Sequence, residues 1–373
     1  MAFTNFGKLT DHQSTVWARD VWREARETSF FIRNFAGSDA NSMIHSIKEL
    51  REVKGAARAV ITLVPDLEGD GVVGDNQLEG NEEEIKAYDQ VFEYDQIRNA
   101  NRLEGRMADM RSIIAFRSNS RNLLAHWLAT RLDELFVLTA SGVSFDRKTN
   151  GAMRIGSQFP QLAFAPYVTA PSANRHFRWD GTALVPGSTG DITPTDLPSW
   201  EMLIDIKAKA VDSNIRPIRT EGGYEHFNVF MTGAGIAHLK KDPDFINAWT
   251  HAQKRGDENP LFKGTKRGGT TGFYIDGLNI MEYKQVYNTT GAPDGSKWGA
   301  DGDVDGQRIL VAGAQALAMA DIGLPRWVEK DFDYDNSPGV SIAKLIGMHK
   351  PVWQSSTTGT KEDFGLFVVD TAI

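Results

Sequence analysis

Residues 55–91 read GAARAVITLVPDLEGDGVVGDNQLEGNEEEIKAYDQV, which is two strand-like segments separated by a long acidic loop. The first segment, 56–64, is rich in small and β-branched residues, and residues 87–99 alternate with an imperfect period of two. Both patterns predict β-strands. Connections longer than about 15 residues are uncommon inside compact domains and usually have a function. We therefore expect a long β-hairpin that reaches away from its own core.

The acidic charge of the chain is concentrated in this hairpin. The whole chain has a formal net charge of −8, whereas residues 65–95 contain 11 acidic residues and one base, Lys86, for a net charge of −10. The remaining residues therefore sum to +2 (−8 minus −10). A near-neutral body with one acidic arm favours contacts between subunits. The loop residues expected at an assembly interface are Asp66, Glu68, Asp70, Glu79, Glu82, Glu83 and Glu84.

The first part of the chain predicts an amphipathic helix. Residues 8–35 carry apolar side chains at helical spacing, and Trp17, Trp22, Phe30 and Phe31 give this short segment a large apolar load. Two interpretations are open: the helix packs on its own core, or its aromatic face packs against a neighbouring subunit. Because the hairpin already indicates contacts between subunits, we include these four aromatic residues in the expected assembly interface.

Residues 103–141 predict one long helix, because they contain no proline and their apolar residues recur every three or four positions. Such a helix would span about 55 Å at 1.5 Å per residue, and Gly142 is placed to end it. Arginines occur in its first half and just before it. They form either a solvated face or a receptor for an acidic segment. The receptor candidates are Arg102, Arg106, Arg117 and Arg121.

The rest of the chain predicts helices and strands in mixed order, so we expect an α+β fold. Residues 143–198 are rich in Gly, Pro, Ser and aromatic residues, which predicts irregular β structure, and a helix is expected at 200–211. Strands are expected at 227–233, at 272–288 around an Asp276–Gly277 turn, and from 332 onward. The apolar segment 308–320 is expected to be a buried strand or a strand-to-helix segment.

Composition excludes several classes of protein. The 373 residues are 41% hydrophobic and 24% charged, a globular balance that excludes wholesale disorder. The absence of cysteine excludes a disulfide framework, a thiolate nucleophile and Cys-ligated zinc. A net acidic chain argues against a general nucleic-acid binder, which needs a basic face. No apolar run approaches the roughly 20 residues of a membrane helix, and no signal-peptide pattern is seen, so we expect no membrane association.

One motif suggests a metal ion. Asp301, Asp303 and Asp305, followed by Gly306, match the first half of a calcium-binding loop, but Ala312 stands where that loop needs glutamate. A solvated acidic turn is the simpler interpretation, and a cation-dependent enzyme is the alternative. The sequence lacks a phosphate-binding glycine loop, a nucleophile elbow and a helical pair of histidines, so it predicts no catalytic residue and no cofactor.

Stretches along the whole chain resemble the N-four-like family of tailed-phage major capsid proteins, which have the Hong Kong 97-type fold. The block at 55–91 is the most specific of them. The others are TNFGKLT (4–10), NRLEGRMADMRSI (101–113), LATRLDELFVLTASGV (128–143), DGLNIMEYKQVY (276–287), RILVAGAQALAMA (308–320) and DFGLFVVDT (363–371). The predicted order of arm, hairpin, long helix and mixed region is similar to the order in that fold.

The resemblance implies a structural subunit that assembles into hexamers and pentamers of an icosahedral head around double-stranded DNA. It implies no catalytic residues and no cofactor. The divisions that it implies are an N-terminal arm (1–54), an E-loop hairpin (55–101), a peripheral domain with the spine helix at 103–141 (102–200), an axial domain (201–325) and a return to the peripheral domain (326–373).

The resemblance also implies partners and a location. The partners are copies of the chain itself together with portal, scaffolding and decoration proteins, and the location is the virion after assembly in the host bacterial cytoplasm. Some relatives crosslink a lysine of the E-loop, but Lys86 is the only lysine between Pro65 and Asp95, which gives no support for a crosslink. Because the expected arm helix begins within about ten residues of Met1, we expect a separate scaffolding protein. A bacterial shell compartment that encloses enzymes is the alternative with the same fold.

Overall fold

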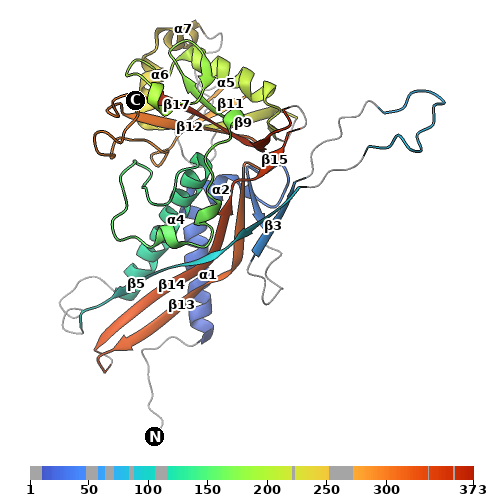
Figure 1. Ribbon diagram of the computed structural model, residues 1–373. Helices are drawn as coiled ribbons and strands as arrows, with labels where there is room; N and C mark the ends of the chain where they lie inside the picture. Colours follow the sequence, from blue (N-terminus) through green and yellow to red (C-terminus); the bar gives the residue numbers. More distant parts are fainter. Residues whose placement is uncertain are drawn as a thin grey trace.

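The computed structural model describes residues 11–47, 58–63, 71–83, 88–105, 116–220, 223–251, 272–334, 336–355 and 358–373. Figure 1 shows an elongated body in which two β-sheets, each with its own helices, follow one another along the long axis. A long loop projects from the side of this body where the two parts meet.

The first sheet has five strands. Their order is β1 (Ala36–Gly37), β2 (Ile44–Ile47), β13 (Leu317–Phe332), β14 (Ser337–His349) and β5 (Asp95–Arg102). β13 and β14 form a long antiparallel hairpin, and its register shifts between Ile322 and Arg326. Pro325 lies in this shift, where its missing N–H costs no ladder hydrogen bond. Helices α1 (Asp11–Thr28) and α4 (Phe116–Ser141) pack on this sheet through β13 and β14.

The second sheet is buried on both faces. Its main strand order is β10 (Gly272–Ile275), β11 (Leu278–Glu282), β9 (Glu225–Met231), β12 (Gly306–Ala312), β17 (Leu366–Ala372), β6 (His176–Trp179) and β7 (Leu184–Pro186), and β8 (Ile218–Arg219) pairs with β9. Alternate residues of β12 belong to different cores. Ile309 and Val311 pack with α5 (Trp200–Asp212), α6 (Gly233–Lys241) and α7 (Pro243–His251), whereas Leu310 and Ala312 join the core that contains α4.

Two smaller pairs of strands and several short helices complete the described part of the chain. The pairs are β3 (Arg58–Leu63) with β4 (Tyr88–Glu93) and β15 (Val352–Gln354) with β16 (Lys361–Asp363). The segment that was predicted as irregular holds 3-10 turns at Phe159–Gln161, Ala165–Tyr167, Ala173–Arg175 and Thr189–Asp191.

Local signals in the sequence explain several element ends. The Ser199 side chain caps α5 by accepting a hydrogen bond from the Met202 N–H. Asp276 and Gly277 both have positive φ, of 44° and 76°, and they form the tight turn between β10 and β11 that was predicted. Gly142, at φ 64°, ends α4, and the Val143 N–H then bonds to the Leu138 carbonyl as in a Schellman motif.

The two predicted helices differ from the observed ones. The expected helix over 103–141 does not include residues 103–105, and the described helix α4 begins at Phe116, while 106–115 lie outside the described residues. The chain is a β-strand as far as Arg102, because β5 pairs with β14 in the register Arg102↔Gly339. The arm is two helices, since α2 (Phe30–Phe35) begins at its own cap, Ser29.

Sheet membership does not follow the ranges implied by the resemblance. β6 and β7 come from the range 102–200, and β17 comes from 326–373. All three lie in the second sheet with β9, β11 and β12, which come from 201–325. The backbone therefore crosses repeatedly between the two halves of the molecule.

Candidate assembly surfaces

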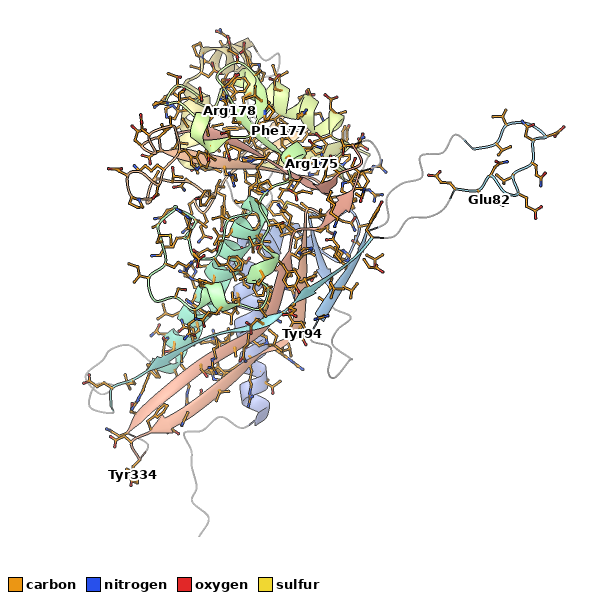
Figure 2. All side chains as sticks on the ribbon, in the orientation of Figure 1. Glu82, Tyr94, Arg175, Phe177, Arg178 and Tyr334 are labelled. Carbon is orange, nitrogen blue, oxygen red and sulfur yellow. The ribbon has the colours of Figure 1, made fainter. Side chains whose placement is uncertain are left out.

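The acidic hairpin projects into solvent. β3 and β4 pair antiparallel from Arg58↔Glu93 to Leu63↔Tyr88, as predicted, and Figure 2 shows Glu82 far from the body. Val72 is half-buried, and the other residues of 71–83 are exposed. Four hydrogen bonds of this segment stay inside the loop, among them Gly80 N–H to the Glu82 carboxylate at 2.7 Å. Asp66, Glu68, Asp70 and Glu84 lie outside the described residues.

The base of the hairpin is fixed to the body. Ala59, Ile61 and Phe92 form a small core with Ala318, Ala320 and Phe364. The Gln90 amide oxygen lies 2.8 Å from His349 Nε2 and accepts the Val352 N–H at 3.0 Å. The His349 ring stacks on Phe92 at 5.4 Å between centroids. Burial, aided by the charge of Lys350, lowers the pKa of His349 to about 4.

The aromatic residues of the arm pack mainly inside their own chain. Trp22 and Phe31 are 5% and 2% exposed and belong to the main core, so almost all of their surface packs inside the chain, and a role for them at an intersubunit surface stays a prediction. Trp17 and Phe30 are half-buried against the same core. Phe30 stacks on Tyr283 at 4.5 Å between ring centroids. The main core that receives these side chains comes from segments distant in sequence, which helical periodicity cannot reveal.

Asp133 joins the arm to the long helix, and sequence reasoning missed it. Its buried carboxylate accepts hydrogen bonds from the Ser29 hydroxyl (2.6 Å), the Phe30 N–H (3.0 Å), the Phe31 N–H (3.2 Å) and the Tyr283 hydroxyl (3.0 Å). Burial raises the pKa of Asp133 although these four bonds favour the ionised form. An acid inside the apolar run of α4 was the signal that could have indicated this role.

The described arginine candidates hold elements of one chain together. Arg102 is in β5 and not in a helix, so it shares no helical face with Arg106, which lies outside the described residues. Its guanidinium lies 4.2 Å from the Phe332 ring centroid, and its Nε donates to Ser337 Oγ at 2.9 Å. Arg117 pairs with Glu329 at 3.0 Å, and Arg121 lies 4.0 Å from Glu24 and 5.7 Å from the Trp17 ring centroid.

The 301–306 motif does not gather cation ligands. Asp301 and Asp303 are exposed, and the Asp305 carboxylate lies 3.0 Å from Lys297 Nζ. Throughout the part of the chain that the structure describes, no group of three or more His, Cys, Asp or Glu residues could hold a metal ion. Lys297 neutralises the negative charge of Asp305, which a bound cation would need. This geometry favours the interpretation of 301–306 as an acidic turn.

A second set of residues missed from the sequence is a series of buried ion pairs. Arg308 makes a bidentate pair with Asp370 at 2.7 and 2.8 Å and donates to the Ser141 carbonyl at the end of α4 (2.8 Å). His176 Nε2 also lies 2.7 Å from Asp370. Burial opposes ionisation of Asp370, but Arg308 outweighs it and holds the pKa of this carboxyl below its ordinary value.

Two neighbouring pairs complete this set, namely Arg175 with Glu362 and Lys350 with Asp363, both at 3.0 Å. Single charges inside apolar strands, such as RILVAGA and LFVVDT, were the available signal. Arg175 precedes β6 of the second sheet and Lys350 follows β14 of the first, and both pair with carboxylates of β16, so these two pairs link the two halves of the molecule.

These surfaces define a structural protein that associates with copies of itself. Its exposed acidic loop extends away from its own body, and the buried carboxylates Asp363 and Asp370 are paired with cations of the same chain. Within the described ranges, no helix is both long enough and apolar enough to cross a membrane.

Comparisons with known proteins agree with this class. The family model described as phage capsid protein matches residues 5–373. The major capsid protein of Pseudomonas phage KPP25 is 53% identical over 371 residues, which are 98% of this chain and 97% of that protein. The chain belongs to the phage capsid protein family, so it is a structural protein and the alternative of a cation-dependent enzyme is wrong.

Solved capsid structures confirm the fold. The capsid of Ralstonia phage GP4 has a TM-score of 0.74 and 25% identity, covering 93% of this chain and 92% of that one. The capsid asymmetric unit of cyanophage Pam1 has a TM-score of 0.68 and 16% identity, with coverage of 100% and 96%, and this likeness concerns the fold alone. The predicted α+β fold of Hong Kong 97 type is therefore confirmed.

Proposed function

We propose that this chain is the major capsid protein of a tailed phage of the N-four-like group, and that it builds an icosahedral head from hexamers and pentamers. Membership of the phage capsid family and the identity with the KPP25 major capsid protein support this proposal. The observation that carries the assembly mechanism is the hairpin loop 71–83, which is almost wholly exposed and extends away from its own body.

Assembly proceeds by exchange of the projecting loop. Each acidic loop lies over a neighbouring subunit, while the body stays rigid because a continuous core joins its two sheets and the pairs of Arg175 and Lys350 with β16 link them further. Single surface ion pairs contribute only about 0–1 kcal/mol, so stability of the shell comes from their repetition over many subunits together with burial of apolar surface. In this proposal the five-stranded sheet with α4 forms the peripheral domain and the eight-stranded sheet forms the axial domain, to which β6, β7 and β17 contribute from 102–200 and 326–373.

The proposed head encloses double-stranded DNA without reading its sequence. Assembly takes place in the host cytoplasm with portal and scaffolding proteins, and decoration proteins bind the finished shell. The net charge of −8 supports a container that does not bind nucleic acid strongly over its whole surface.

Negative-stain electron microscopy of the purified chain tests the proposal. Closed, regular shells of one or a few diameters are expected when the chain is concentrated with its scaffolding protein, and DNA-filled heads are expected from infected cells. Soluble monomers under all assembly conditions would contradict it. Small shells filled with enzyme cargo would identify a bacterial compartment.

A further inference from the structure

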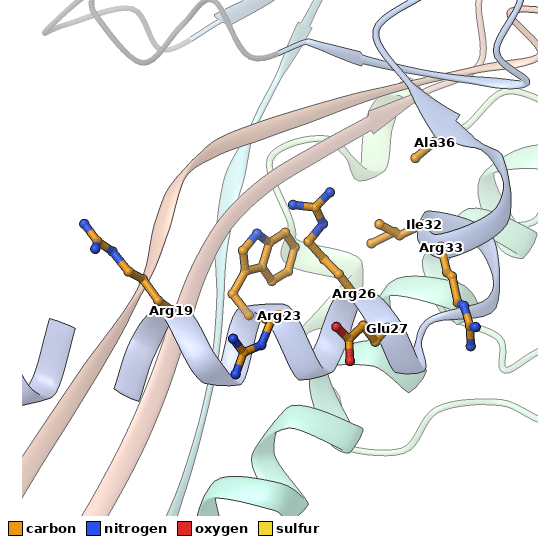
Figure 3. Close-up of a pocket in the computed structure, with 8 residues that line it drawn as sticks. Arg19, Arg23, Arg26, Glu27, Ile32, Arg33 and Ala36 are labelled. Carbon is orange, nitrogen blue, oxygen red and sulfur yellow. The ribbon is translucent and has the colours of Figure 1, made fainter. Parts of the chain in front are cut away.

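The arm contains a basic pocket that the intrachain contacts leave open. Arg19, Arg23 and Arg26 stand at spacings of four and three in α1, so they share one helical face. Arg33 joins them from α2, across the junction at Ser29 (Figure 3). The pocket has a volume of about 490 Å³ and is also lined by apolar side chains, including Trp22 and Ile32.

The pocket has a clear excess of positive charge. All four arginines are exposed, and Glu27 is the acidic residue of the lining, so the formal charge is +3 (four arginines minus one glutamate). Arg23 has a partner in Asp20 at 3.0 Å, but its side chain remains 70% exposed. By contrast, Arg117 and Arg121 on α4 already face Glu329 and Glu24 within the chain. The arm therefore offers an acidic partner more accessible arginine than α4 does.

We infer that this pocket receives the acidic loop of a neighbouring copy of the chain, an inference that rests on the proposed function as a shell subunit. The described part of the loop, 71–83, contains Asp75, Glu79, Glu82 and Glu83 and no basic residue, so its charge of −4 complements the +3 of the pocket. Planar guanidinium groups match carboxylates in bidentate geometry, which gives the contact a defined register as well as attraction.

The occupant is a second copy because the loop extends away from its own arm (Figure 1). Its strands are fixed at their base by the small core around Phe92 and by the contacts of Gln90 with His349 and Val352. From that base the loop points away from the body (Figures 1 and 2).

The pocket suits carboxylates on a protein loop better than nucleic acid. Non-specific binding of nucleic acid uses an extended basic face that neutralises several phosphates in a row. Here the arginines surround a concave site that includes Glu27, and the chain as a whole is acidic. DNA binding at this pocket is therefore an outcome that the test must distinguish.

Charge exchange tests the inference with full-length chains. The double variant Arg19→Glu with Arg26→Glu is expected to lose shell assembly while its circular dichroism stays that of the wild type. Adding Glu79→Arg with Glu82→Arg to the same chain should restore shells in part. The first two substitutions leave the pocket at −1 facing a loop of −4, and the second two bring the loop to 0, so the repulsion is removed. The control, Lys240→Glu with Lys241→Glu, makes the same change of net charge on α6 and should still assemble.

The outcomes separate this inference from the proposed function. Normal shells from Arg19→Glu with Arg26→Glu would overturn the inference, whereas the proposed function is judged by whether the wild-type chain forms shells. Normal shells that fail to retain DNA would overturn it too, in favour of a nucleic-acid site. Failure of the fourfold variant to assemble, with its fold intact, would likewise count against direct pairing of loop and pocket.

A proximity experiment gives an independent measurement, because the chain has no cysteine of its own. Shells made from the variant Arg26→Cys with Glu82→Cys are treated with a short bismaleimide and analysed on a denaturing gel. Ladders of linked chains are expected, since each loop would reach the next arm. The control pair Lys241→Cys with Glu82→Cys should remain monomeric. If shells of the first variant give only unlinked chains on the gel after treatment, the inference is overturned.

Discussion

Replacing Asp133 by alanine should loosen the arm from the long helix. The substitution removes the acceptor of two backbone N–H groups, those of Phe30 and Phe31, and of the Ser29 and Tyr283 hydroxyls. The Tyr283 hydroxyl has a second acceptor in the Gln285 amide oxygen at 3.0 Å. The two N–H groups at the start of α2 lose this acceptor, and a buried donor without a partner costs about 1–3 kcal/mol.

The expected loss of stability is about 3 kcal/mol, which is the sum for two N–H groups reduced by the cost of burying a charge that alanine avoids. The raised pKa of Asp133 reflects this cost of burying the charge, because burial disfavours the ionised carboxylate. Asp133→Asn keeps one oxygen acceptor and should lose about 1–2 kcal/mol. These are large fractions of the 5–15 kcal/mol that stabilises a typical domain.

Urea unfolding of the unassembled subunit measures these losses, and hydrogen exchange at the Phe30 and Phe31 amides localises them. The control is Asp20→Ala, which removes an exposed pair with Arg23 and should cost no more than about 0.5 kcal/mol. The capping role of this carboxylate would be refuted if Asp133→Ala lost no more unfolding free energy than the control. It would also be refuted if Asp133→Ala lost less than Asp133→Asn.

Three further predictions concern the hairpin and the end of α4. Changing the three glutamates at 82–84 to lysine should block particle formation and leave the subunit folded; normal particles by electron microscopy would contradict charge docking. His349 has a folded pKa of about 4 against an ordinary 6.5, so the unfolded chain takes up its proton first, and stability should fall by about 3 kcal/mol as pH drops from 6.5 to 4. In His349→Phe, the free energy of unfolding measured with urea should depend less on pH between 6.5 and 4. A pH dependence equal to that of the wild type would refute the role of His349. Gly142→Ala should lower the melting temperature and cost about 1–3 kcal/mol, because φ is +64° and the new Cβ would lie 2.5 Å from the Thr169 carbonyl oxygen; a wild-type melting temperature would contradict this.

The sequence predicted the elements whose signals are local. The β3–β4 hairpin, the Asp276–Gly277 turn, the helix after Ser199 and the end of α4 at Gly142 all depend on residues within a few positions. These signals act before any tertiary contact forms, so they can be read directly from the chain.

The features that were missed depend on partners far away in sequence. Trp22 is buried by the main core, which includes strands beyond residue 310, and periodicity shows only that it faces something apolar. Arg102 belongs to a strand because β14 lies beside it, more than 230 positions later. Asp133 was overlooked because its partners, Ser29 and Tyr283, become neighbours only in the folded chain.

The interleaved strands of the two sheets also bear on how the chain folds. β6, at residues 176–179, pairs with β17, at 366–372, and β5 pairs with β14 across a similar separation. Contacts between residues so far apart in sequence slow folding, because the chain loses the entropy of closing long loops before it gains the contacts. Neither sheet can be completed during synthesis until the residues beyond 337 have emerged from the ribosome. Partly made chains would therefore expose unpaired strand edges, so this subunit should depend on chaperones before it is competent to assemble.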